Sequence, residues 1–284
     1  MLDFIKVSHR DTKSGLEIYP KFIVRSSEDL MIRGSDFYAI WNEETNLWST
    51  DEGVALYLID KDLQVGLEEC KKKFPEYVDR MHATWMWDAD NKQIDRFHHY
   101  VKNQLRDNDH PLDEKLIFSN VETTRKDYAT KKLPYPLEEC PTPAWDELIS
   151  TLYSPSEQHK IEWAIGSVVA GDSKDIQKFL VMYGAPKTGK STILNVIQEL
   201  FDGYWTAFDS QALGSANASF ALESFKYNPL VAIQHDGDLS RIEINTRLNS
   251  LVSHETMTVN DFYFLFLIIS IFHLLNLLLF LLHY

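Results

Sequence analysis

The residues best suited to chemistry in this chain lie between Gly184 and Ser191, where the sequence reads Gly-Ala-Pro-Lys-Thr-Gly-Lys-Ser. The run matches the pattern G-x-x-x-x-G-K-[ST] at every fixed position, and this pattern is typical of loops that bind nucleotide phosphates. Its two glycines let the backbone turn so that successive amides point inward, while a following helix N-terminus adds partial positive charge. The sequence therefore predicts a phosphate-binding loop.

Two side chains of the loop have separate roles in this prediction. Lys190 would neutralise the β- and γ-phosphates, and the Ser191 hydroxyl would coordinate a Mg²⁺ ion bound to the same oxygens. With the start of the following helix included, the predicted nucleotide-binding residues are Gly184, Ala185, Pro186, Lys187, Thr188, Gly189, Lys190, Ser191 and Thr192.

The elements that flank the loop are those that must position it. The apolar run Phe179–Tyr183 is short enough for a buried strand, and Thr192–Phe201 carries apolar residues at helical spacing. The alternative is an accidental glycine-containing turn between a strand and a helix. Since strand, loop and helix follow in the order that the motif needs, we favour the phosphate loop.

A second acidic element follows another predicted strand. The strand covers Pro229–Ile233 and runs into Gln-His-Asp-Gly-Asp-Leu-Ser. We expect Asp236 in the Mg²⁺ shell and Asp238 polarising the attacking water. Because two polar residues separate the strand from Asp236, the two roles could be exchanged. An Asp-Gly-Asp sequence is by itself usually a turn, which is the competing interpretation.

Composition limits what else the chain can bind. Its 284 residues are 44% hydrophobic and 13% aromatic, which excludes a disordered chain. A formal net charge of -14 argues against an extended nucleic-acid surface, so any DNA site must be local. The only cysteines, Cys70 and Cys140, are too few for a disulfide framework and favour a reducing cytoplasm.

Two further sets of residues have simpler interpretations than a binding site. The three histidines His159, His235 and His254 are scattered and lack metal-ligand spacing, so no metal site is predicted from them. The Lys-Lys-Lys sequence at 71–73 is interpreted as a solvated helix face rather than a DNA contact.

A proline-rich linker divides the chain. Four prolines lie between Lys131 and Pro143, and proline removes backbone donors and fixes φ, so no helix or central strand is expected there. The predicted domains are a small α+β domain over residues 1–140, an α/β domain with the phosphate loop over 141–260, and an apolar tail over 261–284.

Local patterns predict further elements inside these domains. Aromatic and β-branched residues on both sides of Glu-Thr-Asn predict a β-hairpin over residues 36–48. Residues 52–63 form a helix or a strand, and a polar helix is expected over 90–105. Two helices are expected over 144–153 and 157–169, the second after a Ser-Pro-Ser start signal.

Several stretches together resemble a known family. They are residues 143–148, 161–166, 177–179, the phosphate loop, 201–204, 220–223, 235–240 and 248–255. They resemble phage and plasmid primase-helicases of the poxvirus type, which belong to superfamily 3. The hairpin around Trp41 and Trp48 resembles the domain that precedes the ATPase there. The resemblance covers residues 30–260, and the phosphate loop is its only highly specific part.

The resemblance implies an ATP-dependent, ring-forming DNA helicase for phage or plasmid replication, with ATP and Mg²⁺ as cofactors. The implied fold is an α/β P-loop NTPase of the modified AAA+ type, a three-layer sandwich that is incomplete here. Its implied partners are single-stranded or forked DNA, five further copies in a homo-hexamer, and a primase or other replication proteins. By position, Asp236 and Asp238 belong to the family's second acidic motif. Residues 249–260 resemble the start of its third motif, whose hairpin reaches DNA.

The tail departs from the family. Phe262–Leu282 contains no Asp, Glu, Lys or Arg over 21 residues, which meets the length criterion for a transmembrane helix. The family's sensor residue and arginine finger are not present after Asn260, and no basic flank accompanies the apolar run. We interpret the tail as the product of a frameshift or read-through, which the transcript sequence tests. The alternative for the tail is an evolved membrane anchor. The alternatives to a helicase are a non-catalytic nucleotide-binding module and a membrane-tethered replication factor.

Overall fold

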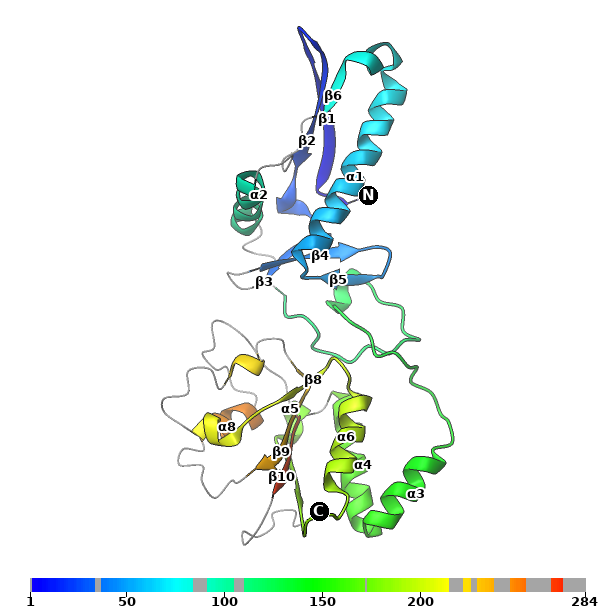
Figure 1. Cartoon of the computed structure of the whole chain (residues 1–284), viewed down its shortest axis with the longest axis vertical. Helices are drawn as coiled ribbons and strands as arrows, with labels where there is room; N and C mark the ends of the chain where they lie inside the picture. Colours follow the sequence, from blue (N-terminus) through cyan, green and yellow to red (C-terminus); the bar gives the residue numbers. More distant parts are fainter. Residues whose placement is uncertain are drawn as a thin grey trace. The chain divides into compact units, whose positions relative to one another are not determined.

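The computed structural model describes residues 2–33, 37–83, 91–104, 110–171, 173–214, 222–225, 229–237, 246–253 and 267–272. The chain forms two compact units, shown in Figure 1. Unit 1 comprises Met1–Leu112 and Glu122–Lys131, and unit 2 comprises Asp113–Val121 and Lys132–Tyr284. The chain therefore passes between the units three times, the third time at the start of the proline-rich segment.

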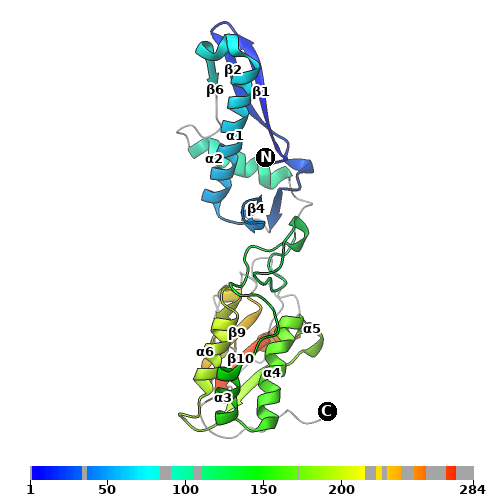
Figure 2. The ribbon, with the colours of Figure 1, turned by 90° about the vertical axis from the view of Figure 1, so that its right-hand side faces the viewer.

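Unit 1 begins with a β-hairpin that belongs to a three-stranded sheet. Strands β1 (Ile5–Thr12) and β2 (Gly15–Phe22) are antiparallel, and β6 (Met81–Ala83) pairs with β2 in parallel. Helix α1 (Glu52–Lys73) lies along one face of this sheet, as Figure 2 shows. A Cβ at Gly66 would lie 2.2 Å from Val7 Cγ2, so this glycine permits the close approach of helix and strand.

The remaining elements of unit 1 include the predicted hairpin. Strand β4 (Phe37–Asn42) pairs with β5 (Leu47–Ser49), Trp41 lies opposite Trp48, and the two indole centroids are 5.7 Å apart. The hairpin prediction is therefore confirmed, and β3 (Leu30–Arg33) adds a third strand. The other elements are α2 (Asn91–Gln104) and the 3₁₀ helices η1 (Val24–Ser26), η2 (Pro75–Arg80) and η3 (Arg125–Asp127).

Helix α1 resolves the ambiguous assignment of residues 52–63. The Asp51 carboxylate accepts hydrogen bonds from the amides of Gly53 and Val54, which stabilises the start of a helix. The lysine triplet 71–73 forms the last turn, where cations interact favourably with the helix dipole. These terminal interactions explain why the segment is helical.

Unit 2 is an α/β structure. Its sheet has the order β7-β10-β9-β8, and every neighbouring pair is parallel. The strands are β7 (Leu180–Tyr183), β8 (Trp205–Ala207), β9 (Val231–Gly237) and β10 (Leu267–Phe272). The helices are α3 (Pro143–Leu152), α4 (Pro155–Ala170), α5 (Ser173–Ile176), α6 (Lys190–Leu200), α7 (Ser210–Gly214), α8 (Thr246–Val252) and the 3₁₀ helix η4 (Glu223–Phe225).

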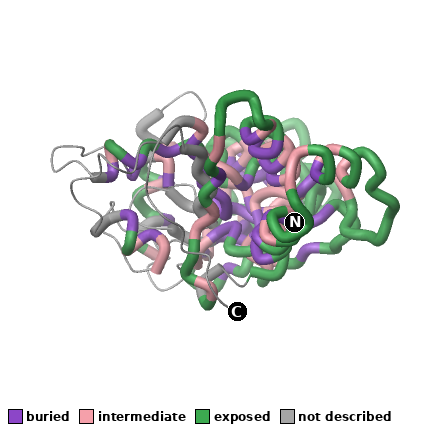
Figure 3. The backbone as a smooth tube through the Cα atoms, turned by 90° about the horizontal axis from the view of Figure 1, so that it is seen from below, coloured by how far each residue is buried: buried purple, intermediate pink, exposed green. Residues whose placement is uncertain are grey.

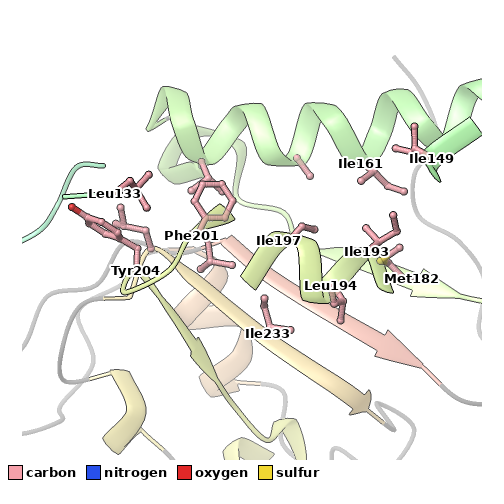
Figure 4. Close-up of a cluster of buried hydrophobic side chains, with 14 of the residues drawn as sticks. Leu133, Ile149, Ile161, Met182, Ile193, Leu194, Ile197, Phe201, Tyr204 and Ile233 are labelled. Atoms are coloured by element: carbon pink, nitrogen blue, oxygen red, sulfur yellow. The ribbon is translucent and has the colours of Figure 1, made fainter. Parts of the chain in front are cut away.

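Helices contact both faces of this sheet. On one face, Ile193 and Ile197 of α6 pack with Ile233 of β9, and Ile161 of α4 joins the same cluster, as Figure 4 shows. On the other face, the amide of Ser210 in α7 donates to Gln234 Oε1 of β9. Figure 3 shows how the buried positions alternate with exposed ones along the chain. The core of unit 2 therefore lies largely between α4, α6 and the sheet.

Strand β10 corrects the prediction for the apolar tail. The apolar run 262–282 meets the length criterion for a transmembrane helix, which is the alternative to a frameshift or read-through product, yet residues 267–272 form a strand between β7 and β9. A strand of a parallel sheet is covered on both faces and reads as a continuous apolar run, so hydropathy does not distinguish it from a transmembrane helix. The rest of 262–282 lies outside the described residues. Within the described part of the chain, no helix has both the length and the apolarity needed to span a bilayer.

Candidate nucleotide-binding site

The phosphate loop joins β7 to α6 in the structure, and Figure 1 shows both elements. Strand β7 ends at Tyr183, residues 184–189 form the loop, and α6 begins at Lys190. The predicted order of strand, loop and helix is therefore confirmed. All nine predicted nucleotide-binding residues lie in the loop or in the first turn of α6, so one short segment brings them together.

The Lys190 side chain is folded into its own loop. Its Nζ atom lies 2.6 Å from the carbonyl oxygen of Ala185, 3.1 Å from that of Gly184 and 3.0 Å from Thr188 Oγ1. The residue is only 5% exposed. The Thr188 hydroxyl also donates to the Ala185 carbonyl at 2.9 Å. These oxygen contacts compensate for the burial of a charged amine, and they hold the ammonium at the centre of the loop.

The backbone of the loop depends on Gly189. Its φ is +78°, in the left-handed region, and a Cβ there would lie 2.5 Å from Leu152 Cδ1. Two independent constraints, backbone conformation and the close contact with α3, therefore exclude a side chain at this position. Lys187 also has a positive φ, of 65°. Its side chain is exposed, in contrast to that of Lys190.

The start of α6 supplies groups suited to an anion. Gly189 is the N-cap residue and has no side chain that could accept hydrogen bonds from the first amides of the helix. Ser191 and Thr192 are exposed in this first turn. Uncapped amides and the helix dipole favour a negatively charged group at such an end. Phosphate oxygens would therefore complement this part of the chain chemically.

The acidic segment reaches the same edge of the sheet. Tyr183, the last residue of β7, pairs with Phe272 of β10, and Phe272 pairs in turn with Gly237 of β9. Neighbouring strands lie about 4.8 Å apart, so the ends of β7 and β9 are roughly 10 Å apart with β10 between them. Asp236 precedes Gly237 within β9. The phosphate loop and the acidic segment thus start from the same level of one parallel sheet.

Of the two predicted acids, Asp236 lies within the described residues. The backbone of Asp236 belongs to β9, which extends three residues past Gln234 rather than ending at Ile233. Asp238 lies outside the described residues. The pairing of β9 with β10 shifts register between Ser270 and Phe272, opposite the segment that contains Asp236. Such irregularities can re-aim side chains at the end of a strand.

A polar link that the sequence analysis missed joins α6 to β9. The Nε2 atoms of Gln198 and His235 lie 2.9 Å apart, and both side chains are half-buried. The sequence does offer one indication of this hydrogen bond. Gln198 is a polar residue four positions after the buried Leu194, on an otherwise apolar helix face. The hydrogen bond connects the helix that follows the phosphate loop to the strand that carries Asp236. Leu152, the neighbour of Gly189, was also missed, because a contact between segments distant in sequence leaves no local pattern.

His159 does not join this site. His159 is an exposed residue of α4, and His254 lies outside the described residues. In the described ranges, no group of three His, Cys, Asp or Glu side chains could hold a metal ion. Of residues 249–260, those up to Val252 belong to α8, and His254 onward is not described.

The site therefore has a sequence-local part, the loop and the first turn of α6, and a part that the sheet assembles, the end of β9. The local part offers an ammonium, a helix N-terminus and the hydroxyls of Thr188, Ser191 and Thr192. It follows β7, which is the outermost strand in the order β7-β10-β9-β8 and has one buried residue, Met182, rather than being the buried strand that the sequence predicts. Neither a family model nor a curated protein matches the chain.

Proposed function

We propose that the chain is an ATP-dependent DNA helicase of phage or plasmid replication, built on a P-loop NTPase fold of the modified AAA+ type. The observation that carries the proposal is the placement of Lys190, whose ammonium is held by three oxygens of the loop that precedes its helix. A phosphate oxygen is a stronger partner for an ammonium than a neutral carbonyl oxygen. The loop therefore keeps the charge where a triphosphate needs it.

The residues of the site would divide the work of hydrolysis. Lys190 exchanges its carbonyl partners for phosphate oxygens, and the amides at the start of α6 bind the same anion. Ser191 and Asp236 would hold Mg²⁺, which neutralises the charge on the phosphates when it is bound. Asp238 would orient and polarise the attacking water. The alternative is that the two acids exchange these roles.

The partners follow from the proposed activity. A helicase of this type acts on single-stranded or forked DNA as a homo-hexamer, together with a primase or other replication proteins. Since the whole chain carries a net charge of -14, its DNA contacts must be confined to local basic surfaces. Cys70 and Cys140 are both free thiols, which fits the reducing cytoplasm of a bacterial cell that carries the phage or plasmid.

Nucleotide binding by two lysine variants tests the proposal. We expect Lys190→Ala to weaken binding of Mg-ATP by about ten- to a hundredfold, the range for losing a charged hydrogen-bonding group. Lys178→Ala is the matched control, because it removes an exposed lysine that precedes β7 and lies outside the loop, and it should change binding little. A folded chain that does not bind Mg-ATP would overturn the proposal.

Turnover separates the helicase from the competing function. DNA-stimulated ATP hydrolysis that is lost in Lys190→Ala supports a motor. Binding of Mg-ATP without turnover, in the presence of single-stranded or forked DNA, would instead indicate a non-catalytic nucleotide-binding module.

A further inference from the structure

The β1-β2-β6 sheet of unit 1 has one face that no described helix covers. Side chains alternate between the two faces along each strand. Leu16 and Ile18 of β2 are buried and pack with Leu67 of α1, so they mark the covered face. Figure 2 shows α1 along that side. We call the opposite side the outer face. Its charged and aromatic residues are Lys6, Arg10, Glu17, Tyr19, Lys21 and His82, and Ser8 and Thr12 of β1 lie on the same face.

The outer face is basic in an acidic protein. Lys6, Arg10 and Lys21 contribute three positive charges, and Glu17 is the one carboxylate among the six residues. Lys6, Arg10, Lys21 and His82 are exposed. Because the chain as a whole carries a net charge of -14, this local excess of positive charge is opposite in sign to the rest of the molecule. Charge complementarity therefore points to an anionic partner for this face.

Lys6 and Lys21 stand directly opposite each other. The register of β1 and β2 pairs these two residues, so their Cβ atoms are about 5 Å apart. Like charges at opposed positions destabilise a sheet. An anion bound between the two ammonium groups would reverse this repulsion. A phosphate group is an anion of suitable size, and it accepts hydrogen bonds from both amines.

The face also carries an aromatic ring beside its cations. The Arg10 guanidinium lies 5.7 Å from the centroid of the Tyr19 ring, and Arg10 Nε donates to Glu17 Oε2 at 2.6 Å. Tyr19 is half-buried, so its ring is held in place but is still reachable. Nucleic-acid bases stack on aromatic rings and on guanidinium planes. Side chains that can bind phosphates and side chains that can stack on bases thus occupy neighbouring positions on two strands.

We propose that the outer face of the β1-β2-β6 sheet binds single-stranded DNA, with Lys6 and Lys21 on backbone phosphates and Tyr19 with Arg10 stacking a base. A flat sheet surface suits splayed bases, whereas a duplex groove admits a helix or a protruding ribbon. A membrane is disfavoured as the partner, because none of the six residues is a large exposed aliphatic side chain that could insert into lipid. The proposed function also involves DNA, but DNA binding by the outer face does not require the phosphate loop.

The test measures binding of a fluorescently labelled oligothymidine to the full chain over a range of salt concentrations. Each phosphate contact contributes about 0.7 to the slope of log K against log salt for single strands, so Lys6→Gln with Lys21→Gln should lower the slope by about 1.4. At 0.1 M salt this corresponds to about 25-fold weaker binding, and the difference should vanish near 1 M. Tyr19→Leu should weaken binding about tenfold, while Tyr19→Phe should retain it.

Matched controls make the outcome decisive. Lys72→Gln with Lys126→Gln removes two exposed lysines of unit 1 away from the outer face, and we expect little change in binding. Equal losses in both double variants would overturn the proposal in favour of general electrostatics. It would also fail if the Lys6 and Lys21 variant bound normally, or if duplex DNA, oligouridine RNA or phosphatidylserine vesicles bound better than oligothymidine.

A further variant distinguishes this proposal from the assignment of the phosphate loop. Lys190→Ala should keep its oligothymidine binding in the absence of nucleotide. Conversely, the Lys6 and Lys21 variant should keep its affinity for Mg-ATP. The failure of one proposal is therefore recognisable when the other holds.

Discussion

Gly189 of the phosphate loop and Leu152 at the end of α3 lie so close together that no side chain fits at position 189. A Cβ atom there would come within 2.5 Å of Leu152 Cδ1 and 2.7 Å of Cδ2. The loop is therefore supported from α3 at the residue that precedes α6. This contact adds a packing reason to the conformational reason for glycine, whose φ is +78°.

The first prediction concerns this contact. Gly189→Ala should destabilise unit 2 by about 1 to 3 kcal/mol, since the new methyl group overlaps Leu152 and the left-handed backbone is strained. It should also weaken binding of Mg-ATP. Urea denaturation and nucleotide titration measure the two effects. In a double-mutant cycle, Leu152→Ala relieves the overlap, so the double variant should lose less than the sum of the single losses. Strict additivity would contradict the contact.

The second prediction separates the two acids. If Asp236 holds Mg²⁺, Asp236→Asn should raise the Mg²⁺ concentration needed for half-maximal ATP hydrolysis by about 10- to 100-fold. If Asp238 polarises the water, Asp238→Asn should lower kcat by about 10²- to 10⁴-fold with little change in the affinity for Mg-ATP. The opposite assignment of effects would show that the roles are exchanged. Wild-type kinetics in both variants would remove the acidic segment from the site.

The third prediction concerns β10. A chain ending at Asn260 lacks the strand that pairs with both β7 and β9, so the two strands lose their shared ladder. Unpaired strand edges promote association, and we expect loss of the thermal transition of unit 2 together with aggregation. Differential scanning calorimetry and light scattering measure this. Unchanged unfolding and unchanged nucleotide binding in the shortened chain would contradict a structural role for residues 267–272.

The fourth prediction concerns the start of α4. The hydroxyl and then the amide of Ser154 donate to Glu157, and these hydrogen bonds lower the pKa of Glu157 below its usual value. Because the folded-state pKa is the lower one, ionised Glu157 stabilises the fold above about pH 4.3, its unfolded-state pKa. This contribution is lost as the pH falls through the folded-state pKa.

Glu157→Gln measures that contribution. Since the carboxylate is exposed and screened by solvent, we expect a loss of about 0.5 kcal/mol at pH 7. The difference from the wild type should shrink in urea denaturation at acid pH. Glu139→Gln, an exposed carboxylate in the proline-rich segment, is the charge control. A difference that is constant with pH would rule out the ionised carboxylate as its source.

Several elements of this protein follow from local sequence patterns alone. Gly184–Ser191 carries its own turn geometry and cations, and the Ser154 start signal specifies where α4 begins. The hairpin of β4 and β5 follows from the polar turn between two aromatic segments. Each of these depends on residues close together in the chain, so their spacing in the sequence is also their spacing in the structure.

The way these elements come together depends on long-range packing, which local patterns do not predict. An apolar run has the same hydropathy in a buried strand as in a helix that spans a bilayer, so the position of β10 between β7 and β9 depended on long-range pairing. That pairing sets Tyr183 level with Gly237. The contacts of Gly189 with Leu152 and of Gln198 with His235 likewise join different elements. Such contacts form when the chain packs, and no local sequence pattern specifies them.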